Sequence, residues 1–244
     1  MKAIILAAGI GKRFREITDH RPKCLIEIQG KTLLERTLTA LRAAGVEEAV
    51  VVIGYRSEMI QQQIGSNYGG VRVRYVKNPQ YAKGAILSLW SAREEFNDDI
   101  IVMDADVLFP VALIKRLVHS SHANCFLLDG SSENTGEEQM LLTRNGRVLN
   151  IVRGGAGDFE VIGESVGFLK VSRTDAPLLR SILEEFVAQG QDTIEHEEAF
   201  PLFLAQRIVG FERVDDLPWI EIDFSTDLEQ AEHEVLPRIL ALDH

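Results

Sequence analysis

The sequence predicts an α/β protein whose central sheet is mostly parallel. Through the first half of the chain, apolar runs of β-type composition alternate with amphipathic stretches of helical length. After about residue 123 the pattern changes to short apolar runs separated by turn residues. Strands that alternate with helices form right-handed βαβ units, so the first half predicts a parallel sheet with helices on both faces. A chain of 244 residues can bury one substantial core.

Each element of the first half follows from its own pattern. Residues 3–8 form an apolar run that ends in glycine, and residues 31–44 have the spacing of an amphipathic helix that Gly45 closes. Ligands of such sheets bind at the carboxyl ends of the strands. The other predicted strands cover residues 48–53, 71–76 and 100–103, and the other predicted helices cover residues 57–64 (capped by Ser57), 85–96 and 111–120.

The second half predicts an antiparallel section followed by helices. Turn residues such as Asn145-Gly146 and Gly154-Gly155 separate its short apolar runs. No internal repeat or linker divides the chain, so we expect a single domain over residues 1–244 with two halves. The loop 130–136 has the composition of a flexible lid. The predicted strands cover residues 125–128, 140–144, 148–152 and 165–171, and the predicted helices cover 181–188, 195–205 and 225 to about 240, the last capped by Ser225.

Composition argues against several classes of protein. Hydrophobic content of 45% is ordinary for a globular protein, and no apolar run approaches the length of a membrane span. Met1-Lys2 leads into a core strand without a signal-peptide pattern, and the two cysteines, Cys24 and Cys125, lie far apart in sequence. Both observations predict a cytoplasmic protein with reduced thiols. A net charge of −11 disfavours a nucleic-acid partner, and binding of anionic substrates requires a local cluster of cations together with a metal.

The segment after the first strand has the composition of a phosphate-binding turn. In Gly9-Ile-Gly-Lys-Arg13 the glycines let the backbone approach phosphate oxygens, and the two cations neutralise charge. Pro22 restricts the residue before it and so helps to direct a further cation, Lys23. The segment is neither a Walker A loop nor a complete dinucleotide fingerprint, and an ordinary glycine turn is the alternative interpretation.

A longer pattern resembles a known family of enzymes. Leu6-Ala-Ala-Gly-x-Gly-x-Arg13, followed by Lys23-Cys-Leu25, resembles the signature of nucleotidyltransferases that join an NTP to a phosphorylated metabolite. The cytidylyltransferases for phosphocholine and for phosphonates are the members that it resembles most. The resemblance implies a Rossmann-like, mixed but mostly parallel sheet flanked by helices (a GT-A-like nucleotidyltransferase fold) with a small antiparallel lobe on the acceptor side. It also implies Mg²⁺ as cofactor, a nucleotide-binding half (1–122) and an acceptor-binding half (123–244).

The same resemblance assigns roles to residues of the first segment. It implies that Arg13 holds the phosphate tail together with Lys12, and that Lys23 meets the charge that builds at the α-phosphate. Arg13 and Lys23 are therefore the expected catalytic residues. The expected nucleotide contacts in this segment are Leu6, Ala7, Ala8, Gly9, Gly11, Lys12 and Arg13.

Two pairs of acidic residues are candidates for a metal site. Asp104 and Asp106 follow the strand 100–103, where carboxylates suit Mg²⁺, although this spacing is also common in turn capping. Glu221 and Asp223 have the period-2 spacing that places both on one face of a short strand, either around a cation or at a solvated edge. The resemblance implies that Asp106, Glu221 and Asp223 bind the metal, with Asp106 and Asp223 as the clamp and Asp104 supporting the nucleotide site.

The segment 78–88 is a loop that leads into a predicted helix. Small residues at its start suit a close approach of the nucleotide base or a phosphate, whereas an amphipathic core helix is the alternative. The resemblance implies further nucleotide contacts from Tyr81, Gly84, Ala85 and Ser88.

The acceptor region is expected to be acidic. Glu164 and Glu197, with an aromatic side chain such as Trp219, suit an amine or a quaternary ammonium group. Arg153 and Lys170 are candidates to hold the acceptor phosphate. A solvated helix start is the alternative interpretation of residues 195–198, and no second histidine lies at metal-ligand spacing from His196.

The function that these observations predict is attack of a phosphate or phosphonate oxygen on the α-phosphorus of an NTP, with CTP as the first choice. A sugar-1-phosphate nucleotidyltransferase is the nearest alternative, because it needs the same residues and a different acceptor pocket. A metal-dependent glycosyltransferase and a non-catalytic nucleotide-binding module are the alternatives from other classes. The expected partners are the NTP and a small phosphorylated acceptor, with no nucleic acid and no membrane insertion. The oligomeric state stays open, and a homodimer is among the options.

Overall fold

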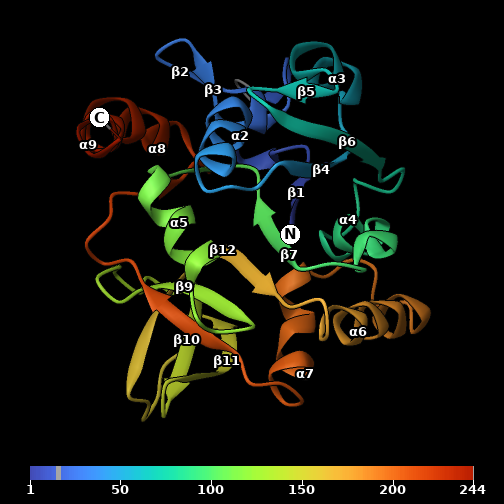
Figure 1. The fold of residues 1–244 in the computed structure, drawn as a ribbon, viewed down its shortest axis with the longest axis vertical. Helices are drawn as coiled ribbons and strands as arrows, with labels where there is room; N and C mark the ends of the chain where they lie inside the picture. Colours follow the sequence, from blue (N-terminus) through green and yellow to red (C-terminus); the bar gives the residue numbers. More distant parts are fainter. Residues whose placement is uncertain (15–17, 244) are drawn as a thin grey trace.

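The computed structural model describes residues 1–14 and 18–243, apart from the side chain of Lys12. The predicted contribution of Lys12 to phosphate binding therefore lies outside the described residues. A mixed sheet of ten strands forms the centre of the molecule (Figure 1). Within the described part of the chain, no helix is both long and apolar enough to cross a membrane.

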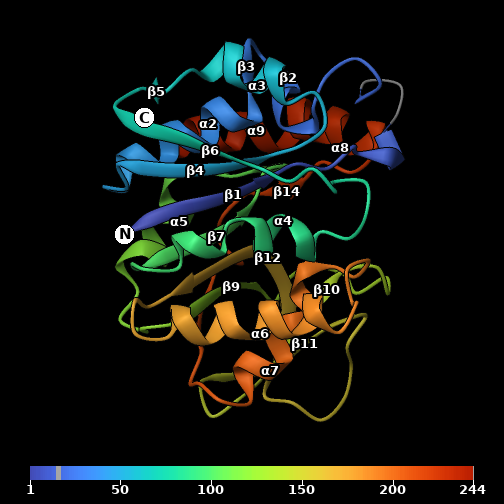
Figure 2. The ribbon, with the colours of Figure 1, turned by 90° about the vertical axis from the view of Figure 1, so that its right-hand side faces the viewer.

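The first half builds the parallel part of the sheet. Strand β1 (Lys2–Ala7) is central and pairs in parallel with β4 (Glu48–Ile53) and β7 (Ile100–Asp104). Strand β6 (Val71–Lys77) extends this part beyond β4, and the short β5 (Asn67–Tyr68) forms the edge. In Figure 2 the strands β6, β4, β1, β7 and β12 follow one another from top to bottom. The predicted α/β fold class with a mixed, mostly parallel sheet is confirmed.

The second half continues the same sheet in antiparallel fashion. Strand β12 (Val161–Val171) uses its last residues to pair with β7 and its first residues to pair with β10 (Gln139–Arg144). Strand β11 (Arg147–Arg153) follows β10 at the edge, and β9 (Cys125–Asp129) packs against the bulged middle of β12. A further strand, β13 (Gly210–Arg213), pairs with β9, and the sequence pattern did not predict it. The division into functional halves at residue 122 stays a prediction.

Helices cover both faces of the sheet because successive side chains of a strand point to opposite faces. Ala3, Ile5 and Ala7 of β1 face one buried cluster, which includes residues of α2 (Leu33–Ala43), α3 (Ser57–Ile64) and α5 (Val111–His119). Ile4 faces the opposite cluster. That second cluster contains residues of α4 (Ile86–Ser91), α6 (Ala176–Ala188) and α7 (Phe200–Leu204).

A third, smaller core joins the two ends of the chain. Helices α8 (Ser225–Gln230) and α9 (Leu236–Leu242), with a π-helical turn between them, pack beside the segment that carries β2 (Glu27–Ile28) and β3 (Lys31–Thr32) (Figure 1). The two-stranded ribbon of β8 (Val107–Leu108) and β14 (Ile220–Glu221) borders the same core. Its buried residues include Phe14, Ile26, Leu108, Ile222 and Leu236. This core therefore brings three segments that are distant in sequence to one place.

Several predicted helix boundaries were wrong. The helix expected at 85–96 ends at Ser91, where Arg93 donates a hydrogen bond to the Trp90 carbonyl and lies over the Trp90 ring, and a 3-10 turn follows. The helix expected at 195–205 is a 3-10 turn (His196–Ala199) followed by α7. Helix α6 begins at Ala176 rather than at 181 because Pro177 suits a first turn.

The two predicted caps were also wrong, because Ser57 and Ser225 are the first residues of their helices. Arg56, in a left-handed conformation, precedes α3. At α8 the carboxylate of Asp227 accepts hydrogen bonds from the backbone N–H groups of Asp223 and Phe224. This capping by an acidic side chain fixes the backbone immediately before α8, where Asp223 lies.

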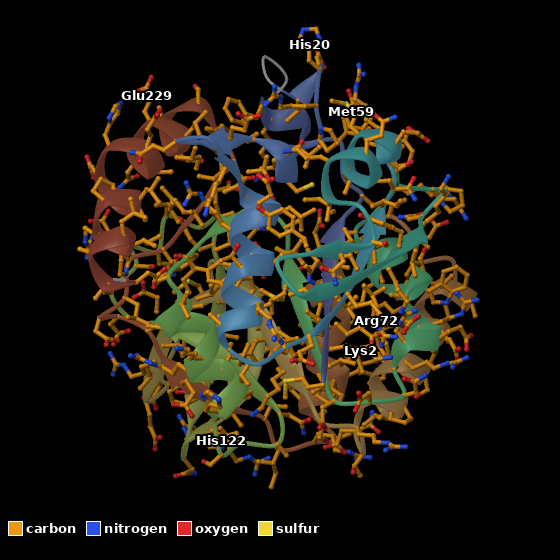
Figure 3. All side chains as sticks on the ribbon, turned by 45° about the horizontal axis from the view of Figure 1, so that its top comes forward. Lys2, His20, Met59, Arg72, His122 and Glu229 are labelled. Atoms are coloured by element: carbon orange, nitrogen blue, oxygen red, sulfur yellow. The ribbon has the colours of Figure 1, made fainter. Side chains whose placement is uncertain are left out.

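An ion-pair network closes the amino ends of the parallel strands. Arg74 of β6 donates to Glu48 of β4 at 2.7 Å and to Glu95 at 2.6 Å, and Lys2 of β1 donates to Glu95 at 3.0 Å. Arg72 also pairs with Glu48, and Lys2 and Arg72 lie on the same side of the molecule (Figure 3). The Arg74 guanidinium, aided by Lys2, outweighs burial and lowers the pKa of Glu95 to about 2. Charge pairing therefore stabilises the amino ends of these strands, and the carboxyl ends take no part in this network.

We predict that Glu95→Gln lowers the free energy of unfolding by about 2 kcal/mol at pH 7, because the folded state holds the ionised carboxylate more favourably than the unfolded chain. The stabilisation is present above the unfolded pKa of about 4.5 and is lost as the pH falls towards 2. Urea denaturation at pH 7 and pH 3 measures it, with exposed Glu229→Gln as the control. A constant difference between Glu95→Gln and the natural protein at both pH values would contradict the prediction.

Candidate functional site

A cavity of about 420 Å³ opens beyond the carboxyl ends of β1 and β7. Most of the residues expected to bind the nucleotide line it: Leu6, Ala8, Gly9, Gly11, Arg13, Tyr81, Ala85, Ser88 and Asp104. Ala7 does not, because it lies in the buried cluster on the other face of the sheet. Gly84 does not line it either. Gly84 packs against the backbone of Thr193 and Ile194, so a Cβ at this position would clash with that backbone.

The glycine turn after β1 has a conformation that positions Arg13. Gly11 has a φ of 67°, and a Cβ there would lie 2.9 Å from the side chain of Thr18. The carbonyl of Gly11 accepts hydrogen bonds from the N–H of Phe14 and from the hydroxyl of Thr18. These contacts close a 3-10 turn (Lys12–Phe14) in which Phe14 is buried and Arg13 is exposed towards the cavity.

Lys23 lies between two carboxylates that are distant from each other in the sequence. Its Nζ is 2.7 Å from Oδ2 of Asp106 and 2.6 Å from Oδ1 of Asp223. Buried Cys24 and Leu25 anchor the 3-10 turn (Lys23–Leu25) that carries it. Burial alone would lower the pKa of Lys23, but the two carboxylates outweigh burial and raise it, so the ammonium stays charged. Arg13 binds the other oxygen of Asp223 at 2.7 Å.

Asp106, Glu221 and Asp223 form a cluster of carboxylates. One oxygen of each lies within 4.8 Å of the others, because Glu221 of β14 pairs with Val107 of β8 and the N–H of Ile222 donates to the Asp106 carbonyl. Strand β14 ends at Glu221, so Asp223 lies just beyond the strand rather than within it. Oδ1 of Asp106 is buried and has no hydrogen-bond partner among the described residues. Three oxygen donors, one of them unpartnered, fit a hard divalent cation such as Mg²⁺.

Burial and like charge perturb this cluster. Although Glu221 lies at the exposed rim, desolvation, Asp106 and Asp223 together raise its pKa to about 8. For Asp223, by contrast, Lys23 and Arg13 outweigh burial and lower the pKa. The cations of the cavity therefore neutralise the negative charge of Asp223 more fully than that of Glu221.

A second cluster lies in the same cavity and was not foreseen from the sequence. It consists of Asp104 at the end of β7 and of His196 and Glu197 in the turn before α7. The Asp104 carboxylate also packs against Gly167, where a Cβ would lie 2.5 Å from it. Burial and the charge of Glu197 raise the pKa of Asp104 well above its usual range. Sequence spacing carries no signal for this cluster, because the β7–β12 pairing and the docking of the turn create it.

The predicted acceptor residues divide into two groups. Glu164, Glu197 and Arg153 line the cavity, and Arg153 pairs with Glu137 at 3.2 Å. Lys170 does not line it: Lys170 is opposite Ile101 in the β12–β7 register, towards the amino end of β7, and donates to the Ser120 carbonyl. The cavity also receives residues that the sequence did not single out, including Glu137, Glu138 and Gln139.

Trp219 also lies away from the cavity lining. Its Nε1 donates a hydrogen bond of 2.8 Å to Asp129 at the end of β9, and its ring packs on the first buried cluster. The structure thus gives Lys170 and Trp219 packing roles. The lid expected at 130–136 stays a prediction.

We predict that Glu221→Gln is more stable than the natural protein at pH 9 and equally stable at pH 4. The folded state raises the pKa of Glu221 from an ordinary 4.5 to about 8, so ionisation costs stability as the pH rises between these values. The glutamine side chain does not ionise, which removes this cost. Urea denaturation in the presence of a chelator measures the effect, and a stability difference that does not change with pH would contradict it.

Comparisons with known proteins identify the family of the chain. Residues 3–154 match the model of the MobA-like NTP transferase domain. The chain is 31% identical to choline-phosphate cytidylyltransferase from Haemophilus influenzae over 78% of its length and 76% of the relative. It is 28% identical to CMP-5'-(3-aminopropyl)phosphonate synthase from Streptomyces rubellomurinus over 97% of its length, but spans 39% of that protein.

Solved structures share the fold. The CTP:phosphocholine cytidylyltransferase from Streptococcus pneumoniae superposes with a TM-score of 0.79 at 24% identity, over 95% of this chain and 97% of the other. The inositol-1-phosphate CTP transferase from T. maritima gives a TM-score of 0.78 at 22% identity, over 98% of this chain and 95% of the other. With the family model matching more than half of its residues, this chain belongs to the MobA-like NTP transferase domain family and is a nucleotidyltransferase.

Proposed function

We propose that the protein is a Mg²⁺-dependent cytidylyltransferase that joins CTP to a small phosphorylated amino alcohol or aminoalkylphosphonate and releases pyrophosphate. The observation that carries the proposal is the convergence of Lys23, Asp106 and Asp223 at 2.7 and 2.6 Å beside the glycine turn. This arrangement combines a cation for the phosphates with carboxylates for a metal. The acidic composition of the rest of the cavity supports an acceptor that carries an amine.

On the nucleotide side, the glycine turn and Arg13 would hold the phosphate tail. Arg13 is exposed towards the cavity, so its guanidinium can leave Asp223 for phosphate oxygens. Lys23 would meet the negative charge that develops at the α-phosphate, which is the kind of electrostatic stabilisation that dominates phosphoryl-type transfers. Ala85 and Ser88, at the start of α4, line the region expected for the base and ribose.

Asp106, Asp223 and Glu221 are the residues proposed to hold Mg²⁺. The unpartnered oxygen of Asp106 and the close approach of the three carboxylates support this assignment. When bound, Mg²⁺ would supply positive charge to the nucleotide phosphates. Lys23 uses one oxygen of Asp106 and one of Asp223, so Oδ1 of Asp106 would remain as a ligand for the metal.

On the acceptor side, a phosphate or phosphonate dianion is already a nucleophile, so the reaction needs no general base from the protein. The catalytic contribution is then orientation and neutralisation of charge. Arg153 is the candidate for holding the acceptor phosphate, since it lines the cavity. Carboxylates outnumber basic side chains there: the acids are Asp104, Asp106, Glu137, Glu138, Glu164, Glu195, Glu197, Glu221 and Asp223, and the bases are Arg13, Lys23, Lys83 and Arg153.

The excess of carboxylates over basic side chains in the cavity distinguishes the proposed cytidylyltransferase from its nearest alternative. A sugar-1-phosphate nucleotidyltransferase would use the same cations and metal ligands but would bind a neutral sugar. A neutral sugar leaves Glu164, Glu195 and Glu197 without a positive partner on the substrate, whereas an ammonium group compensates them. The acidic lining therefore favours an amine-bearing acceptor.

We predict that Lys23→Ala and Asp106→Asn each lower turnover by roughly 10²–10³-fold, because the first removes a cation at the reacting phosphates and the second removes a proposed ligand of the metal. Single-turnover pyrophosphate release with saturating CTP measures the loss. Lys31→Ala, an exposed lysine on β3, is the matched control and should retain normal turnover. Thermal denaturation of each variant in Mg²⁺ verifies folding, and near-normal turnover of a folded Lys23→Ala variant would remove Lys23 from the mechanism.

We predict that pyrophosphate release is confined to CTP with an amine-bearing acceptor. The assay crosses CTP, UTP, GTP, ATP and dTTP with phosphocholine, 2-aminoethylphosphonate and glucose 1-phosphate in the presence of Mg²⁺. Turnover with glucose 1-phosphate would be compatible with the proposed catalytic residues but would contradict the proposal that the acceptor carries an amine. Turnover that prefers another nucleotide would reject the choice of CTP.

A further inference from the structure

The imidazole of His196 lies between two carboxylates of the cavity without hydrogen-bonding to either. Its Nε2 is 3.9 Å from Oδ1 of Asp104, which is too long for a direct hydrogen bond. Its Nδ1 is 3.1 Å from Oε2 of Glu197 but lacks hydrogen-bond geometry, and it is a buried polar atom without a partner among the described residues. A buried polar atom without a protein partner calls for an explanation, and a bound molecule that reaches the imidazole is one that the cavity allows.

The position of this histidine is fixed by its surroundings. His196 is 3% exposed, and Phe200 packs edge-on against its ring at 5.6 Å between centroids. Glu195 and Glu198 form a reciprocal capping box around the turn that carries it. The ring is therefore held in place while His196 contributes to the cavity lining.

The three side chains lie close enough together to contact one small cationic group. One nitrogen of His196 and one oxygen each of Asp104 and Glu197 all lie within 4.8 Å of one another. The set offers three acceptors, two of them carboxylates, and a primary ammonium has three N–H donors and one positive charge.

A quaternary ammonium does not match this set. It has no N–H to donate and is recognised by the faces of aromatic rings. Among the described residues that line the cavity, the aromatic rings are those of Tyr81 and His196. Tyr81 packs against Gly54 and Tyr55 beyond the end of β4, and Trp219 bonds to Asp129. The triad of Asp104, His196 and Glu197 thus presents hydrogen-bond acceptors, whereas a trimethylammonium group binds in a cage of aromatic rings.

We propose that Asp104, His196 and Glu197 bind the primary ammonium group of the acceptor, and that they make the protein select primary amines over quaternary ammonium compounds. This inference rests on the proposed function, which supplies the acceptor phosphate and its reaction. It adds two residues, Asp104 and His196, to the acceptor site and narrows the substrate class to primary aminoalkyl phosphates or phosphonates.

The first experiment compares 2-aminoethylphosphonate with its N-methyl, N,N-dimethyl and N,N,N-trimethyl forms as acceptors in the pyrophosphate assay. Each methyl group removes one donor, so kcat/KM should fall stepwise, by about tenfold or more for each charged hydrogen bond lost. Equal kcat/KM values across the series would overturn the inference while leaving the cytidylyltransferase proposal intact.

A second experiment does not depend on turnover. Calorimetry in the presence of Mg²⁺ compares binding of 2-aminoethylphosphonate with ethylphosphonate, which lacks the amine. We expect Glu197→Gln and His196→Ala to weaken binding of the amine by about tenfold to a hundredfold and to leave binding of ethylphosphonate unchanged. If no substrate pair releases pyrophosphate, the proposed function fails and these binding constants alone decide the role of the triad.

Glu198→Gln is the matched control, since it removes the same charge one residue further along the turn. Its amide oxygen can still accept the capping hydrogen bond from the Glu195 N–H. An equal loss of amine affinity in Glu198→Gln would show a general effect of charge and would overturn the inference. Binding of Co²⁺ with a d–d absorption that Glu197→Gln abolishes, together with equal affinity for amine and ethylphosphonate, would instead assign the triad to a metal ion.

Discussion

The site depends on holding like charges together. Asp106, Glu221 and Asp223 approach within 4.8 Å of one another, and such an arrangement is costly unless cations lie among the carboxylates. Lys23 supplies the first of these cations by bridging Asp106 and Asp223, and Arg13 adds a second on Asp223. Both are also the proposed ligands of the nucleotide, so under this proposal the charges that stabilise the free site would also contact the phosphates.

Hydrophobic packing away from the cavity makes this convergence possible. Ile222 and Leu108, which lie near the carboxylates Glu221, Asp223 and Asp106 in the sequence, are buried in the third core together with Ile26, which follows the turn of Lys23. Helices α8 and α9 complete this core from the far end of the chain. Apolar burial in this core therefore contributes to the free energy that keeps the charged groups close. The amino ends of the strands carry complementary ion pairs instead, such as those of Arg74 with Glu48 and Glu95.

The second half of the chain contributes acidic residues to the cavity at the end of the parallel sheet. Strand β12 runs antiparallel to β7, so its residues near Gly167 reach the carboxyl end of β7 while Lys170 lies towards the amino end. The left-handed Gly167 lets the Asp104 carboxylate pack against the strand backbone. The turn that precedes α7 adds His196 and Glu197 from the other side. Acidic side chains therefore predominate in the lining of the cavity, as they do in the chain as a whole, whose net charge is −11.

The α/β class, the strands of the parallel half and the glycine turn that follows β1 could be predicted from the sequence alone, because these depend on side-chain periods and on backbone freedom within a few residues. The sequence also offered Lys23, Asp106 and Asp223 as candidates, and the family resemblance implied that Asp106 and Asp223 hold one metal ion. The contacts of Lys23 with both carboxylates, the end of α4 at Ser91 and the place of His196 beside Asp104 depend on tertiary packing. Lys170 and Trp219 show the reason most clearly: residue type indicates what a side chain can bind, but strand register and packing decide which way it lies.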